Sequence, residues 1–325
     1  MARSDRPAKP PEAPCVVSAE ERLEKLVETR LEEKGTRRTF LKVFGLGAAV
    51  AASGCGNGAP TTEEFFRQHY TKLTDADKAR IFRRIEDETL ARTGVATHIS
   101  DPPPIDGVEF AYALNLSVCN GSRRCVEACA RENNLPDDPE IRYIRVFEME
   151  AGSLDFGEAT PNYGDEEKVP VKGKFYMPVQ CHQCDNPPCV KACPVGATWK
   201  ERDGIVVIDY SWCIGCRFCI VACPYFARRF NWTEPTVAPE RINPDQGYLS
   251  NRPRPKGVVE KCTFCLHRTR KGRLPACLEA CPTGARKFGN MNDPNSEIRK
   301  IIETKRVYVL KEDLATLPRF YYFFS

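Results

Sequence analysis

The sequence predicts an α+β fold in which short strands and single helical turns surround cysteine-rich loops, with a helical N-terminal segment ahead of them. The chain of 325 residues holds 17 cysteines and 26 prolines, and so many prolines favour a loop-rich body. Most of the cysteines fall in four runs at corresponding positions, which indicates an internal repeat. Apolar residues at helical spacing precede the first run. The four runs occupy residues 119–129, 181–193, 213–223 and 262–281.

The spacing within the runs indicates the chemistry that the cysteines serve. The run at 213–223 reads C-x2-C-x2-C-x3-C and is followed by Pro224, the spacing of bacterial ferredoxins that bind [4Fe–4S] clusters. Three thiolates on one loop hold three corners of a cubane, and the fourth reaches the neighbouring cluster. The run at 181–193 ends in the same way, so the repeat predicts tandem two-cluster bacterial ferredoxin-like modules with loop insertions. A structural zinc protein is the alternative, although zinc sites use pairs of CxxC.

Composition excludes several other classes of protein. The net charge of +4 does not indicate a nucleic-acid binder, and no run approaches the ~20 apolar residues of a membrane span. The sequence has no GxGxxG after a strand, no P-loop, no nucleophile elbow and no HExxH. CxxCH is absent as well, so no c-type haem is expected. These absences favour a chain that carries relay centres and performs no bond chemistry.

Four segments are expected along the chain. Residues 1–35 form a disordered or weakly helical leader, and residues 36–55 form a signal. Residues 56–106 form a helical hairpin followed by a proline linker. Residues 107–325 form the cluster domain, which ends in an aromatic tail.

The signal resembles a twin-arginine export signal. Arg37 and Arg38 are followed by Phe40, Leu41 and a short, weakly apolar stretch, the pattern of that route. A chance basic pair is the alternative. Because iron–sulfur clusters are assembled in the cytoplasm, a route that exports folded proteins fits, and it predicts a periplasmic location at the cytoplasmic membrane.

The end of the signal, Ala52-Ser53-Gly54-Cys55, resembles a lipoprotein cleavage box with Cys55 as the lipidation site. The alternative is an ordinary small-residue cleavage region with a stray cysteine. One lipid chain anchors a protein only marginally, so a docking partner is expected in either case. Cys15 precedes the signal and is given no role.

Local patterns predict the remaining elements. Residues 61–93 predict two helices, the second capped at Thr74-Asp-Ala-Asp77 and carrying an apolar stripe that ends at Leu90. Residues 110–118 alternate like a strand, and residues 141–149 predict another strand inside an insertion. A second insertion spans residues 227–261.

The four runs, with insertions after the first and third and eleven residues inside the fourth, resemble one family. These are the four-cluster iron–sulfur subunits of the dimethyl sulfoxide reductase and polysulfide reductase type, with relatives in periplasmic hydrogenases, nitrite reductases and alternative complex III. The resemblance covers about Gly107 to Asn290. In that family the first and fourth runs share two clusters, and the second and third share the other two.

The resemblance implies four ligand sets, each of which takes its last member from the partner run. They are Cys119, Ser122, Cys125 and Cys281 for cluster 1; Cys181, Cys184, Cys189 and Cys223 for cluster 2; Cys213, Cys216, Cys219 and Cys193 for cluster 3; and Cys262, Cys265, Cys277 and Cys129 for cluster 4.

Ser122 stands where the family has a cysteine. A serine oxygen is a harder ligand than a thiolate and has a far higher pKa, so it binds iron more weakly. The expected cofactors are therefore three [4Fe–4S] clusters plus one [3Fe–4S] cluster. A serine-ligated [4Fe–4S] cluster and an empty site are the alternatives at this position.

The resemblance implies an electron-transfer subunit of a membrane-associated periplasmic respiratory oxidoreductase complex. Its partners would be a multi-helix quinone-binding membrane subunit and a catalytic subunit, molybdopterin-containing in one version, or a cytochrome c subunit. Nucleic acid is not an expected partner. The alternatives are the same subunit in a periplasmic hydrogenase or an alternative complex III-like quinol-oxidising complex, and a free polyferredoxin carrier.

Aromatic and basic residues flank the runs, and each group has its own interpretation. Five aromatic residues are expected to shield clusters from water: Trp199, Tyr210, Trp212, Phe218 and Tyr225. Six basic residues crowd the fourth run, and they either act on a cluster or an acidic partner or form a solvated loop: Lys261, His267, Arg268, Arg270, Lys271 and Arg273. The tail at 319–325 either contacts a membrane subunit or folds back onto the core. His182 lies inside a ligand run but is not expected to be a ligand, because the thiolates suffice.

Overall fold

The computed structural model describes residues 73–163 and 168–325, which lie within the compact unit Glu63–Ser325. The predictions for the leader, the export signal, Cys15, Cys55 and the first helix of the hairpin lie outside the described residues. Among the helices that the structure describes, none is long and apolar enough to cross a membrane.

The described helices are mostly single turns. They are α4 (Asp75–Thr93), α5 (Arg124–Glu132), α6 (Pro188–Lys191), α7 (Phe218–Val221), α8 (Leu266–Thr269), α9 (Ala276–Glu279) and α10 (Glu297–Thr304), with 3-10 turns η3 (Pro239–Arg241) and η4 (Glu312–Leu314).

The described strands are short and form several separate sheets. They are β1 (His98–Ser100), β2 (Phe110–Asn115), β3 (Arg145–Glu150), β4 (Lys174–Val179), β5 (Thr198–Lys200), β6 (Val206–Ile208), β7 (Arg229–Phe230), β8 (Asp245–Gly247), β9 (Val259–Glu260), β10 (Arg286–Asn290), β11 (Val307–Tyr308) and β12 (Phe320–Phe323).

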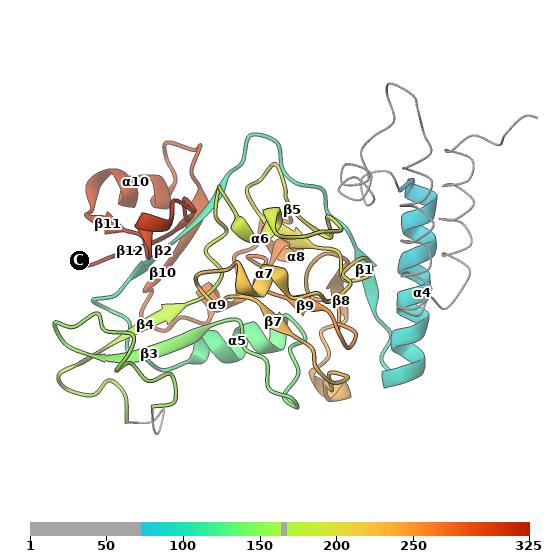
Figure 1. The fold of residues 1–325 in the computed structure, drawn as a ribbon, viewed down its shortest axis with the longest axis horizontal. Helices are drawn as coiled ribbons and strands as arrows, with labels where there is room; N and C mark the ends of the chain where they lie inside the picture. Colours follow the sequence, from blue (N-terminus) through green and yellow to red (C-terminus); the bar gives the residue numbers. More distant parts are fainter. Residues whose placement is uncertain (1–72, 164–167) are drawn as a thin grey trace, which may run out of the picture. The chain divides into compact units, whose positions relative to one another are not determined.

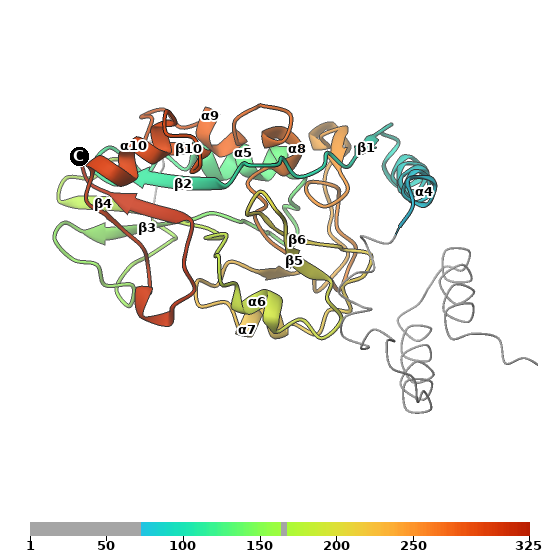
Figure 2. The ribbon, with the colours of Figure 1, turned by 90° about the horizontal axis from the view of Figure 1, so that it is seen from above.

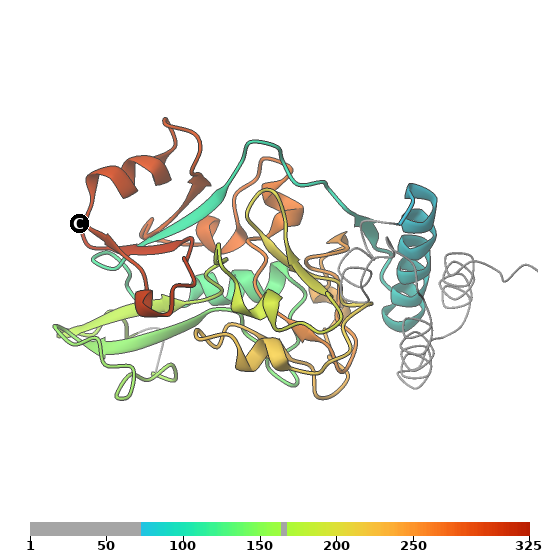
Figure 3. The same ribbon diagram turned by 45° about the horizontal axis from the view of Figure 1, so that its top comes forward.

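The largest sheet has the order β10-β2-β12-β11. β2 pairs antiparallel with β10 and parallel with β12 (Figure 1). Ala111 and Ala113 of β2 pack against Ile298 and Ile301 of α10, and Figure 3 shows α10 beside this sheet. The strand predicted at residues 110–118 is present but ends at Asn115, and its predicted alternation is wrong. β2 is buried on both faces, as strands covered on two sides are.

Four two-stranded sheets complete the unit: β1-β8, β3-β4, β5-β6 and β7-β9. The strand predicted at residues 141–149 is present but begins later, at Arg145, and residues 141–144 form a loop in which Ile141, Tyr143 and Ile144 are buried. It pairs with β4 across the first insertion. The second insertion contributes β7, β8 and β9.

The helical turns of the cysteine runs pack in two pairs. α5 of the first run contacts α9 of the fourth, and α6 of the second contacts α7 of the third. In Figure 2, α6 and α7 lie together on one side of the unit, and α5, α8 and α9 lie on the other. This is the arrangement of two modules, each built from two runs.

α4 starts where the sequence predicts. Thr74 and Asp77 form a capping box, with the Asp77 N–H donating to Thr74 Oγ1 at 3.2 Å. The predicted stripe is only partly right, since Leu90 is 47% exposed. The ring of Phe82 lies 5.3 Å from that of Tyr248, which fixes α4 to the second insertion.

The aromatic tail folds back onto the core. Phe320 and Tyr322 of β12 are fully buried, and the Phe320 ring stacks on Tyr112 with centroids 5.0 Å apart. Of the two interpretations of the tail, packing onto the core is therefore the one that the structure supports.

Replacing Phe320 with alanine is expected to destabilise the unit strongly. Truncating a fully buried phenylalanine typically costs about 3–5 kcal/mol. The Phe320→Ala variant should therefore show a clearly lower apparent unfolding midpoint by circular dichroism. Phe324→Ala is the matched control, because Phe324 is 52% exposed and its loss should cost about 0.5 kcal/mol or less. Equal midpoints in the two variants would contradict this account of the tail.

Candidate iron–sulfur sites

The four runs share one backbone turn. In each of them the residue before the second ligand slot has a left-handed conformation: Gly121 at φ 75°, Gln183 at 46°, Gly215 at 72° and Phe264 at 53°. Such a turn aims a main-chain N–H back at the preceding sulfur, as where the Phe264 N–H donates to Cys262 Sγ at 3.4 Å. Each run therefore curls its first sulfur and its second slot around a common volume.

The side chain of Gln183 explains how a bulky residue holds this turn. Its Nε2 donates to the Cys262 carbonyl at 2.8 Å, and its Oε1 accepts from the Val206 N–H at 2.8 Å. Two hydrogen bonds to separate segments offset the cost of the left-handed backbone.

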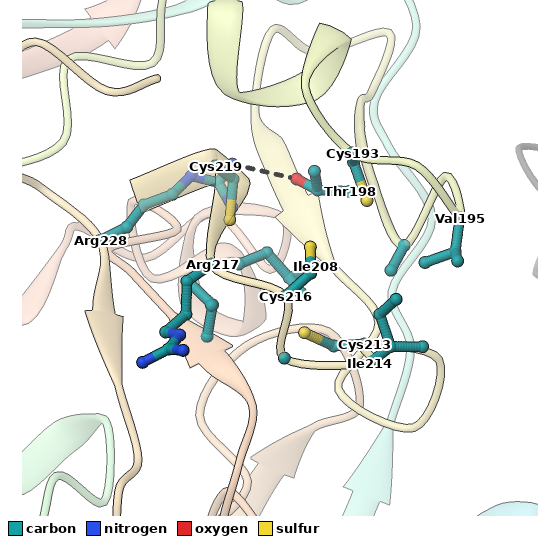
Figure 4. Close-up of a pocket in the computed structure, with 13 residues that line it drawn as sticks. Cys193, Val195, Thr198, Ile208, Cys213, Ile214, Cys216, Arg217, Cys219 and Arg228 are labelled. Atoms are coloured by element: carbon teal, nitrogen blue, oxygen red, sulfur yellow. Dashed lines mark hydrogen bonds between the residues drawn. The ribbon is translucent and has the colours of Figure 1, made fainter. Parts of the chain in front are cut away.

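The second and third runs together surround two cavities. Four cysteines of cluster set 3 line the first, and Figure 4 shows their sulfur atoms turned toward a common space: Cys193, Cys213, Cys216 and Cys219. Four cysteines of cluster set 2 line the second: Cys181, Cys184, Cys189 and Cys223. Each cavity takes one cysteine from the neighbouring run.

The first and fourth runs bring the other two sets together. Burial raises the pKa of Cys265 to about 12, and the nearby Cys277 adds to the effect. Burial likewise raises the pKa of Cys129 well above its ordinary value, and the charges of the other three thiols of its set contribute: Cys262, Cys277 and Cys265. Buried thiols this close together would repel one another as thiolates, so a positively charged metal cluster is the group that suits them.

The set that contains the serine is more open. Burial raises the pKa of Cys119 to about 11, with Cys125 and Cys281 adding to it. Burial also acts to raise the pKa of Cys281. Hydrogen bonds from Thr283 and the neighbouring main chain outweigh this effect, so the pKa of this thiol is lowered. Ser122 follows the left-handed Gly121 and is half-buried, in the same loop position as the cysteines of the other runs.

None of the fifteen cysteines of the runs forms a disulfide. Among the described residues, no group of three or more His, Cys, Asp or Glu side chains is arranged to hold a single metal ion. The two cavities show the arrangement instead, with four sulfurs spaced around a volume. That donor set suits a polynuclear iron–sulfur cluster.

The sets are neighbours in a single order. Burial is the main cause of the raised pKa of three thiols, one in set 3 and two in set 4, and a thiolate of a neighbouring set adds to each shift. The pairs are Cys219 with Cys189, Cys262 with Cys181, and Cys277 with Cys125. Set 3 is thus next to set 2, set 2 next to set 4, and set 4 next to set 1.

Several side chains that the sequence analysis did not assign donate to the sulfurs. Arg228 Nη2 lies 3.0 Å from Cys189 Sγ, and Arg286 Nη2 lies 3.3 Å from Cys125 Sγ. Asn133 Nδ2 lies 3.6 Å from Cys129 Sγ. A signal for the two arginines was present: both end the pattern C-P-x-x-A-R, at 223–228 and 281–286.

Of the five aromatic residues expected to shield clusters, three are buried as predicted, Trp199 is half-buried and Phe218 is exposed. Tyr210, Trp212 and Tyr225 are buried, whereas Phe218 is 60% exposed on α7. His182 is also buried and stacks on Tyr225 with centroids 4.0 Å apart. Burial lowers the pKa of His182 to about 3, so this ring is a neutral packing element.

The interpretation of a solvated basic loop is wrong for most of the six basic residues near the fourth run. Lys261, His267 and Arg268 are buried, and the Arg270 side chain is 1% exposed. His267 and Arg268 both contact Glu132, at 2.8 Å and 2.7 Å. Because Glu132 of the same chain contacts both His267 and Arg268, these two side chains hold the run in place and do not offer a basic docking surface.

Arg270 shows the same internal pairing. Its Nε donates to Asp203 Oδ2 at 2.7 Å, and its Nη2 to Glu201 Oε2 at 3.2 Å. Both acids lie in the turn that joins β5 to β6, between the second and third runs, so this contact joins one module to the other.

Comparisons with known proteins agree with this geometry. A family model described as "4Fe-4S dicluster domain" matches residues 173–239 and 249–291. The chain is 36% identical over 305 residues to a selenate reductase subunit of Mesobacillus selenatarsenatis, covering 90% of this chain and 98% of that protein. The chain belongs to the iron–sulfur subunit family of the dimethyl sulfoxide reductase and polysulfide reductase type. As a member of this family it carries [4Fe–4S] clusters.

Other members of the family serve different complexes. The iron–sulfur subunit 1 of the Hdr-like menaquinol oxidoreductase of Archaeoglobus fulgidus is 42% identical over 211 residues, which cover 61% of this chain and 71% of that protein. A tetrathionate reductase subunit of Salmonella typhimurium is 34% identical over 215 residues, which cover 66% of this chain and 71% of that protein.

Gly215→Ala is expected to empty one cluster site. A Cβ at Gly215 would lie 2.2 Å from the Gly257 carbonyl oxygen, which is main chain and cannot swing away. The variant should lose roughly four irons per chain, the content of one [4Fe–4S] cluster, by iron analysis after anaerobic purification. Gly272→Ala is the control, since Gly272 has a similar φ of +75° but nothing within 4 Å. Full iron content in Gly215→Ala would overturn the role given to this turn.

Proposed function

We propose that this chain relays single electrons along a row of four iron–sulfur clusters, as the electron-transfer subunit of a membrane-associated respiratory oxidoreductase complex. The observation that carries the proposal is the row of sets 3, 2, 4 and 1, in which each set has thiols close enough to influence the next. A relay needs such a row, because electrons then move between neighbouring sites without leaving the protein.

The proposed ligands are the four sets given above. Each bound cluster supplies a centre that changes oxidation state by one electron. The chain holds the thiolates in place, donates N–H groups to sulfur and keeps water away with buried rings such as Tyr210 and Tyr225. Hydrogen bonds to sulfur and solvent exclusion are the levers by which a protein sets cluster potential.

The proposed cofactor count is three [4Fe–4S] clusters and one [3Fe–4S] cluster. The preference for a three-iron cluster in set 1 rests on Ser122, which leaves three thiolates there: Cys119, Cys125 and Cys281. Cluster type is a main determinant of reduction potential, so set 1 would differ in potential from the other three sites.

The proposed partners follow from the family. Its members include subunits of selenate and tetrathionate reductases and of a menaquinol oxidoreductase. We therefore propose a quinone-linked membrane subunit at one end of the row and a catalytic or cytochrome c subunit at the other. Arg37 and Arg38 support export by the twin-arginine route and a periplasmic location, with Cys55 as a second attachment to the membrane.

Replacing Ser122 with cysteine tests both the relay and the cluster in set 1. Wild-type protein, purified anaerobically, should give a [3Fe–4S] EPR signal when oxidised and [4Fe–4S] signals after dithionite. In Ser122→Cys the oxidised signal should be lost and a further reduced cubane signal should appear. Ser117→Cys is the control, because Ser117 is an exposed residue ahead of the same run and should leave the spectrum unchanged.

Two results would contradict the proposal at different levels. Four reduced cubane signals with no oxidised signal in the wild type would mean that Ser122 ligates iron, and only the cluster type would be wrong. Zinc without sulfide in the purified protein would overturn the electron-transfer function itself.

Cell fractionation tests the location and the complex. The wild-type chain is expected on membranes after a high-salt wash, since a partner subunit holds it there. A chain carrying both Arg37→Lys and Arg38→Lys should remain in the cytoplasm, because the twin-arginine route requires the pair. Quantitative release of the wild-type chain by salt would favour a free carrier instead.

A further inference from the structure

We propose that a buried cation stands at each junction between neighbouring cluster sites and allows adjacent clusters to hold electrons at the same time. This inference rests on the proposed relay function. The three cations are Arg228, Lys261 and Arg286, which are 3%, 1% and 3% exposed.

Arg228 occupies the junction between sets 3 and 2. It lines both cavities, and its Nη2 donates to Cys189 Sγ at 3.0 Å and to Thr198 Oγ1 at 3.1 Å, the latter bond visible in Figure 4. Its Nε and Nη1 are buried and have no hydrogen-bond partner among the described residues. A charged group left in this state is costly unless negative charge lies beside it.

Arg286 occupies the junction between sets 4 and 1. Its Nη2 contacts Cys125 of set 1, and thiolates of both Cys125 and Cys277 favour its charge. Its Nη1 donates to Gln180 Oε1 at 2.9 Å. No ion pair with a carboxylate is formed by Arg286 or by Arg228 in the described part of the chain, unlike Arg254, Arg270 and Arg319.

The two arginines also hold equivalent places in the repeat. Each is the fifth residue after the last cysteine of its run, Cys223 or Cys281. The two modules therefore place the same cation between their own two sites. Thr198 holds that place after Cys193, and it accepts a hydrogen bond from Arg228, so one cation serves each module.

Lys261 occupies the junction between the modules, where set 2 meets set 4. Its Nζ donates to the carbonyls of Val206 and Cys262. Burial lowers the pKa of Lys261, and the charges of Cys181 of set 2 and Cys262 of set 4 act against that shift. The row thus alternates between cysteine sets and buried cations from one end to the other.

The physical consequence concerns repulsion between electrons. An electron on one site raises the energy of a second electron on the next site, and the effect is large in a buried, weakly polarisable interior. A cation between the two sites attracts both electrons and offsets that repulsion. Arginine keeps its proton under all ordinary conditions, so the offset by Arg228 and Arg286 is permanent.

The test is an EPR-monitored redox titration of the purified, cluster-loaded full chain. One electron enters each site from dithionite, and no bond to the protein is made or broken. In Arg286→Gln the midpoint potentials of the two sites that flank this junction should fall, while those of the other pair stay unchanged. Arg228→Gln should show the reverse pattern. Arg228→Lys and Arg286→Lys keep the charge and should titrate close to the wild type.

Arg273→Gln is the matched control. Arg273 is exposed and lines neither of the two cavities, so water and salt screen its charge and its removal should shift the midpoints little. Iron content is measured for every variant. If the glutamine variants keep their clusters and their midpoints do not move, the proposal is overturned.

Loss of clusters is also informative. Loss in a glutamine variant but not in the matching lysine variant supports a required positive charge at the junction, whereas loss in both overturns the proposal in favour of a requirement for shape. Failure of the proposed relay function would give a different result, because the wild type itself would then show no reversible titration of its clusters.

Discussion

The structure depends on keeping many ionisable sulfurs together and away from water. Folding raises the pKa of thiols such as Cys119, Cys184 and Cys265 to about 11 or 12 through burial. A protein pays heavily for such burial unless metal takes the protons' place, because metal binding releases protons from its ligands. The bound clusters are expected to supply much of the stabilisation that long helices and strands supply in other proteins. Small sheets and one-turn helices are therefore sufficient around the cysteines.

A second theme is the internal use of charge. The buried pair of Arg254 and Glu260 lies at 3.1 Å, and Tyr143 donates to Glu260 at 2.7 Å. These residues come from both insertions, which are therefore tied together by a buried polar network. The basic residues around the fourth run are used in the same way. A chain with 48 basic and 44 acidic residues thus keeps part of its charge inside, where it organises loops.

The sequence was sufficient for the features that spacing controls. The turn between neighbouring ligands leaves little conformational choice, so the motif predicted loops in which Cys193, Cys213, Cys216 and Cys219 meet. It was also sufficient for the start of α4, where Thr74 and Asp77 satisfy each other within one turn.

Features that depend on distant segments were missed. The burial of both faces of β2 results from α10 and β12, which lie far along the chain, and no local pattern of residues 110–115 encodes it. The burial of His267 and its pairing within the chain were missed because its partner Glu132 is 135 residues away. Phe218 was misassigned because a residue next to a ligand can face either the site or the solvent.

The pairing of runs has a consequence for how the chain is held together. Sets 1 and 4, as proposed, join the first run to the fourth, so an iron–sulfur core there would tie residue 129 to residue 262. A covalent link across a loop of this length removes much freedom from the unfolded chain, by roughly 5 kcal/mol in the chain-entropy account. The clusters of sets 1 and 4 would then close a loop of the chain that contains the whole inner module. The inner module would then stay tethered at both of its ends when one terminus of the chain unfolds.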